Sequence, residues 1–128
     1  MQRQSSFRRI TPWLAALLLL PALACGPSEN ASSGPPDGAQ LYERQGCVTC
    51  HKASGRGGAL GPTLVRTGEY WTREKLAEYL ADPASFVGKD ARLNSIARHF
   101  NMQMPPARLS LEQRLLLADY VLGFTKPE

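Results

Sequence analysis

The stretch Cys47-Val48-Thr49-Cys50-His51 decides how the rest of this chain is interpreted. Two thiols three residues apart, followed directly by an imidazole, is the spacing typical of covalent haem attachment. Each thiol can add across one vinyl group of a haem, and a single turn of chain directs both sulfurs toward the same edge of the macrocycle. His51 then lies under the iron, where a neutral imidazole is a good axial ligand. The motif predicts one haem c, bound covalently through Cys47 and Cys50.

Three other interpretations of the motif fit less well. A thioredoxin-like redox pair requires a βαβ context, and nothing in this sequence alternates strand with helix. A zinc site would have to add His99, the only other histidine, and adjacent Cys50 and His51 are poorly placed to bind one tetrahedral metal. A disulfide between Cys47 and Cys50 is chemically possible but leaves His51 without a role.

Length and charge narrow the class of protein. A chain of 128 residues accommodates one domain with extensions. The formal net charge is +4, but three of the 15 basic residues, Arg3, Arg8 and Arg9, lie in a segment that we expect to be removed, which leaves 12 basic against 11 acidic residues. No run of Lys and Arg occurs in the remainder. Nucleic-acid binding is therefore not expected.

The first 24 residues resemble a secretory signal peptide of the lipoprotein type. A basic start precedes an apolar run over residues 13–20, which is too short to span a bilayer. Small residues then lead to Cys25, as in the lipobox of bacterial lipoproteins, although Ala22 stands where that motif usually has Leu. We expect lipidation of Cys25 and anchoring at the periplasmic face of a bacterial membrane. Ordinary cleavage with a free Cys25 and an uncleaved anchor are the alternatives.

The segment after Cys25 is expected to be a linker. Residues 26–36 contain almost nothing to bury, so their composition predicts a flexible tether, and residues 25–36 together form the lipidated linker. The folded domain is expected over residues 37–126.

Within that domain, apolar spacing and capping residues predict helices and no strands. Asp37 and Gly46 bracket the first helix, Thr72 begins a second that runs to about residue 81, and a third follows Asp90. Ser110 begins the last helix, which runs to about residue 122 and has apolar residues over most of its circumference, so we expect it to be well buried. Residues 52–70 are rich in glycine and predict a loop. The fold class is all-α.

Three residues on or after the third expected helix are candidates for the sixth ligand of the iron. Methionine is a soft ligand suited to haem iron, and Met104 precedes two prolines, which hold its backbone extended and stiff. Met102 lies two residues earlier, and His99 is on the third helix. We rank Met104 first, Met102 second and His99 third.

Residues 38–123 are similar to the class I c-type cytochromes, which carry one haem. The similarity covers the haem motif and several features in the same order along the chain: Gly38 and Tyr42, Gly61 to Leu64, Leu80 to Pro83, Met104 to Pro106, Leu109-Ser110, and Tyr120. It implies a cytochrome c fold of three to five short helices around one covalently attached haem, with the first and last helices crossing near Gly38 and Tyr120. It also implies that the Pro62 carbonyl accepts a hydrogen bond from His51, and that Tyr70 or Trp71 reaches a haem propionate.

This resemblance and the expected ligands indicate a single-electron carrier in a respiratory or other periplasmic electron-transfer chain. Its donor and acceptor would be redox proteins that the sequence does not identify. A haem enzyme or sensor, peroxidase-like or gas-binding, is one alternative, but it needs an open iron position and an acid–base residue. A cytochrome subunit of a larger oxidoreductase complex, for instance in sulfur-compound oxidation, is another.

Overall fold

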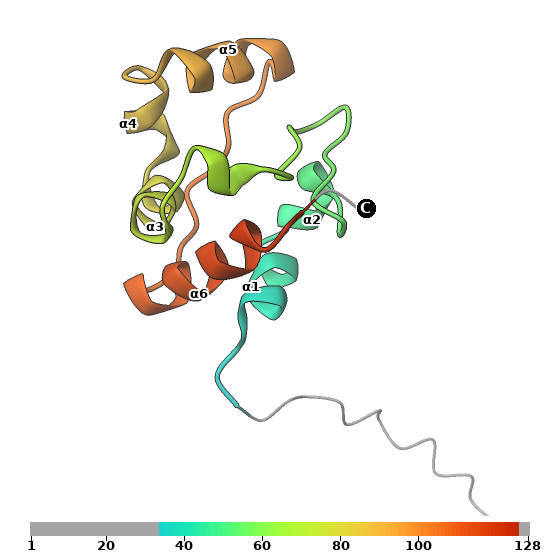
Figure 1. Cartoon of the computed structure of the whole chain (residues 1–128), viewed down its shortest axis with the longest axis vertical. Coiled ribbons are helices and arrows are strands. Elements are labelled where there is room, and N and C mark those ends of the chain that lie inside the picture. Colours follow the sequence, from blue (N-terminus) through green and yellow to red (C-terminus); the bar gives the residue numbers. More distant parts are fainter. Residues whose placement is uncertain (1–33, 126–128) are drawn as a thin grey trace, which may run out of the picture. The chain divides into compact units, whose positions relative to one another are not determined.

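The computed structural model describes residues 34–125, which form helices joined by irregular segments (Figure 1). The α-helices in this part of the chain are α1 (Gly38–Arg44), α2 (Cys47–His51), α3 (Arg73–Ala81), α4 (Pro83–Val87), α5 (Ala91–Phe100) and α6 (Leu111–Leu122), and a 3₁₀-helix, η1, covers Thr67–Glu69. Among these residues the only β-type pairing is an isolated bridge between Gly58 and Gly61. The all-α fold class is confirmed.

The helices outnumber the three to five that the resemblance implied. The two additions to the four helices expected from apolar spacing are α2 and α4, each five residues long. Five residues complete little more than one turn, so they carry no recognisable apolar period. Over residues 34–125, no helix is both long and apolar enough to cross a membrane. The expected signal peptide (1–24), Cys25 and most of the linker lie outside the described residues.

The four longer helices begin where their capping residues predicted. The Asp37 carboxylate accepts from the Gln40 N–H at 2.8 Å at the start of α1, and Gly46, with φ of 74°, follows its end. At the start of α6, Ser110 and Gln113 form both hydrogen bonds of a capping box. At the start of α3 the Thr72 hydroxyl accepts from the Lys75 N–H, and at the start of α5 the Asp90 carboxylate accepts from two backbone N–H groups.

The core lies where α6 packs against α1 and α3 (Figure 1). A Cβ atom on Gly38 would lie 2.4 Å from the carbonyl oxygen of Leu116 and 2.6 Å from Cβ of Tyr120, so glycine is needed where α1 meets α6. This is the close approach that the resemblance implied. The buried core residues are Leu41, Tyr42, Leu76, Ala77, Leu80, Leu117, Ala118 and Val121.

Helix α6 is less buried than its sequence predicted. Leu111 is 59% exposed and Leu116 is 37% exposed. Because α6 contacts α1 on one side and α3 on another, its remaining surface faces solvent although it carries leucines. The expectation of a well-buried helix is wrong at these two positions.

Candidate haem-binding site

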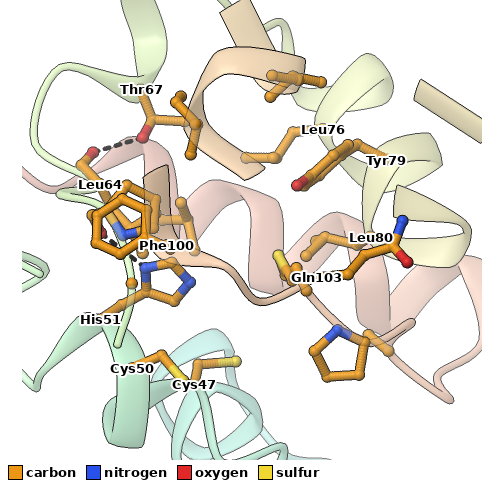
Figure 2. Close-up of a pocket in the computed structure, with 18 of the residues that line it drawn as sticks. Cys47, Cys50, His51, Leu64, Thr67, Leu76, Tyr79, Leu80, Phe100 and Gln103 are labelled. Carbon is orange, nitrogen blue, oxygen red and sulfur yellow. Dashed lines mark hydrogen bonds between the residues drawn. The ribbon is translucent and has the colours of Figure 1, made fainter. Parts of the chain in front are cut away.

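A cavity lined by residues from all six helices lies at the centre of the described domain. The cysteine helix α2, the loop over residues 52–70 and the segment over 101–107 supply much of its wall. Figure 2 shows Cys47, Cys50 and His51 on one side of this cavity and the α3 residues Leu76 and Tyr79 on the opposite side. The lining is mostly apolar, which suits a large flat organic group better than water.

The two cysteines lie side by side at the edge of the cavity (Figure 2). Gly46 turns the chain sharply before α2, and the single turn of helix then places Cys47 and Cys50 on one face. Both side chains are half-buried free thiols. Burial raises the pKa of the Cys47 thiol, and the nearby Cys50 raises it further. The position of both thiols on one side of the cavity, not their pKa, suits them to form two thioether bonds to the same partner.

The His51 side chain is buried and its orientation is fixed. Its Nδ1 lies 2.8 Å from the carbonyl oxygen of Pro62, the hydrogen bond that the resemblance implied. A carbonyl only accepts, so Nδ1 carries a proton, and in the neutral ring Nε2 therefore keeps its lone pair. Figure 2 shows this second nitrogen directed into the cavity. Burial lowers the pKa of His51, while the hydrogen bond to Pro62 opposes this. Burial thus favours the neutral ring, which is the state that binds iron.

The glycine-rich loop packs tightly against α2, which explains its composition. A Cβ on Gly61 would lie 2.9 Å from Cβ of Cys50, and Gly57, with φ of 70°, would place one 2.5 Å from the backbone of Pro62. The N–H of Gly57 also donates to the carbonyl of His51 at 2.9 Å. From the sequence these glycines indicated only a loop. In the structure they allow the loop to approach α2 closely enough for Pro62 to hold His51.

The three candidates for the sixth ligand are placed differently. Met104 is half-buried, lines the cavity and packs against the core. Met102 also lines the cavity, but it is 51% exposed. His99 is exposed, is not among the lining residues, and has its ring 4.8 Å from that of Phe100. The geometry therefore leaves the two methionines as candidates within the cavity.

The two aromatic residues expected near a propionate are separated by the structure. Trp71 lines the cavity, whereas Tyr70 is 60% exposed and is not among the lining residues. The guanidinium carbon of Arg92 lies 4.6 Å from the ring centroid of Tyr70 and 5.6 Å from that of Trp71. Sequence reasoning missed Arg92, because an arginine in the first turn of an amphipathic helix normally indicates only a solvated face.

These residues fit a covalently bound haem. Paired thiols lie on one side, a neutral imidazole projects into the cavity, a thioether is available from Met104, and the walls are apolar. A small helical domain with this site belongs to the class of covalent haem-binding proteins.

The family follows from the sequence match. The model of the family described as Cytochrome c matches residues 36–125, which is most of the chain, so the chain belongs to the cytochrome c family. No curated protein and no solved structure matches the chain significantly. Membership implies a covalently bound haem and haem-based electron transfer in general.

Proposed function

We propose that this protein is a single-electron carrier whose haem c is bound through Cys47 and Cys50 and has His51 and Met104 as axial ligands. The observation that carries the proposal is that half-buried Met104 lines the same cavity into which the free nitrogen of His51 projects. The haem, when bound, supplies the one-electron chemistry. The chain supplies two fixed ligands, an apolar wall that excludes water, and a backbone acceptor that keeps His51 from rotating.

The cavity favours a carrier over an enzyme. Catalysis on a small molecule needs a vacant iron position and a nearby acid or base. Among the described residues that line the cavity there is no Asp, Glu or Lys, and His99, the one candidate acid–base residue that the sequence offered, is not part of the lining. The haem enzyme and the gas sensor are alternatives that carbon monoxide binding separates from the carrier. A cytochrome subunit of a larger oxidoreductase complex is a further alternative.

The proposal includes export and anchoring. Cys25 lies outside the described residues, and its lipidation is supported by the signal-like segment before it and the low-complexity linker after it. We place the domain at the periplasmic face of a bacterial membrane, where it exchanges electrons with redox proteins. Labelling with palmitate and fractionation test this: wild type should be labelled and membrane-bound, and Cys25→Ala should be neither. An unlabelled, soluble wild type would end the anchor hypothesis.

The ligand assignment is tested with a matched pair of variants. Met104→Ala should keep haem attached through both cysteines, lose the weak absorption band of methionine bound to ferric iron, and lower the reduction potential. Met102→Ala removes the same side chain two residues away and should keep the band. The reverse result would assign Met102 as the ligand.

A measurement on the wild type separates carrier from enzyme or gas sensor. With both axial positions occupied, ferrous protein at neutral pH should bind carbon monoxide poorly, and it should exchange electrons rapidly with small redox mediators. Rapid, stoichiometric carbon monoxide binding would refute the carrier proposal.

A further inference from the structure

Arg92 is the one lining residue of the described cavity that carries a permanent charge. Among the residues that line it there is no Asp, Glu or Lys, and burial lowers the pKa of the other potential cation, His51. The Arg92 side chain is 33% exposed, so it is partly withdrawn from water. A charge at an apolar wall is unfavourable unless an anion or an aromatic face compensates it.

The protein compensates Arg92 only in part. Its guanidinium lies over the rings of Tyr70 and Trp71, at 4.6 and 5.6 Å from their centroids. Its Nη2 lies 3.6 Å from Oδ2 of Asp90, which is beyond hydrogen-bond distance. The other carboxylate oxygen of Asp90 caps α5 by accepting from two backbone N–H groups. The two ring contacts and the long ion pair with Asp90 therefore leave N–H donors of the Arg92 guanidinium available to an anion.

The position of Arg92 is at the end of the cavity away from the cysteines. Its neighbour Trp71 lies with its ring 4.9 Å from that of Tyr79, and Figure 2 shows Tyr79 across the cavity from Cys47 and Cys50. In a haem, the two propionates lie on the edge of the macrocycle opposite the vinyl groups. A haem whose vinyl edge was bonded to the cysteines would therefore have its two carboxylates toward the end of the cavity where Arg92 lies.

We propose that the Arg92 guanidinium is the charge partner of the haem propionates, and that Tyr70 serves to hold this guanidinium rather than to bind a propionate itself. The inference rests on the proposed binding of haem in this cavity. Trp71 and Tyr79, which also line the cavity beside Arg92, add an indole N–H and a hydroxyl to the same end. Guanidinium suits this role because its planar set of donors matches a carboxylate.

A cation at the propionates changes the redox equilibrium of the iron. It offsets their negative charge, and so disfavours the more positive ferric state. Removal of one charge at this position should shift the ferric-to-ferrous ratio about tenfold toward ferric, which for a one-electron couple is about 59 mV. The other titratable or charged groups around Arg92 are Asp90, Tyr70 and Tyr79. The Arg66–Glu69 pair lies at the 3₁₀-helix η1 directly before Tyr70, and the variants leave all of these groups in place.

The test measures reduction potential against pH in purified holoprotein. Arg92→Gln should lower the potential by the shift given above and make it depend on pH in the weakly acidic range, because an uncompensated propionate takes up a proton more readily. Arg98→Gln is the matched control: it removes the same charge from the same helix at an exposed residue outside the cavity lining, and it should change neither quantity. Arg92→Lys keeps the charge and should recover most of the potential.

The outcomes separate this inference from the proposed function. A wild type without covalent haem would refute the function, whatever Arg92 does. A haem-loaded Arg92→Gln that matches Arg98→Gln in both potential and pH profile would refute the role of Arg92 alone. If Arg92→Gln does not fold, the wild-type profile decides: a potential that is flat between about pH 5 and 8 supports a compensated propionate, and a titration step within that range overturns it.

Discussion

The contact between α1 and α6 at Gly38 gives the sharpest quantitative prediction. In Gly38→Ala, the added Cβ would lie 2.4 Å from the carbonyl oxygen of Leu116 and 2.6 Å from Cβ of Tyr120. The first neighbour is backbone inside a helix, so it cannot rotate away. The two helices must separate by roughly 1 Å to restore ordinary van der Waals contact.

The size of the effect follows from two opposing contributions. Overpacking of this kind costs about 1–3 kcal/mol of the free energy of unfolding. Replacing glycine by alanine in a helix gains at most about 1 kcal/mol, and less at Gly38 because it is the first helical residue. Separation of the helices also disturbs the contact between the rings of Tyr42 and Tyr120, whose centroids are 5.4 Å apart. The net expectation is a loss of about 1–2 kcal/mol, or about 4–8 °C in Tm for each kcal/mol.

Urea unfolding of the holoprotein, followed by far-ultraviolet circular dichroism, measures this change. Gly88→Ala is the control, because Gly88 has an ordinary φ of −70° and a Cβ added there would have nothing within 4 Å. That variant should be neutral or stabilised by about 0.4–1 kcal/mol. A Gly38→Ala protein as stable as Gly88→Ala would show that helix propensity outweighs the close approach, and the account of the α1–α6 contact would be wrong.

The remaining predictions use the same unfolding assay. Tyr42→Phe should cost about 1–2 kcal/mol, because it removes the hydroxyl that donates to the Lys52 carbonyl at 2.9 Å; an unchanged midpoint would contradict this. Lys52→Gly should be stabilising by up to about 1 kcal/mol, since φ of 65° with ψ of 159° is a region that mainly glycine adopts, and a loss of stability would argue against strain there. Ser110→Ala should cost about 1 kcal/mol by removing the side chain that accepts from the Gln113 N–H, and an effect near zero would mean that the capping box contributes little.

Features that depend on a few neighbouring residues could be predicted from the sequence. Helix starts are examples: the Asp37 and Ser110 caps join atoms three residues apart, so the residue types alone indicate them. The hydrogen bond between His51 and Pro62 spans eleven residues and was expected from the resemblance to c-type cytochromes rather than from spacing. The four longer helices and the all-α class follow from apolar periodicity. The five-residue helices α2 and α4 do not, because one turn has no period.

By itself, the sequence determined the chemistry of the site: the two thiols and the adjacent imidazole that indicate haem attachment, and two methionines from which an axial ligand can come. The tertiary structure alone decided which side chains reach the cavity. It buried part of Met104 and left Met102 exposed, turned Trp71 inward and Tyr70 outward, and brought Arg92 from α5 to both rings. The physical reason is that whether a side chain is buried or exposed depends on which helices pack against it, and those helices come from distant parts of the chain. Whether Tyr70 or Trp71 faces the cavity depends on where α3 and α5 pack, and a local sequence pattern does not predict that.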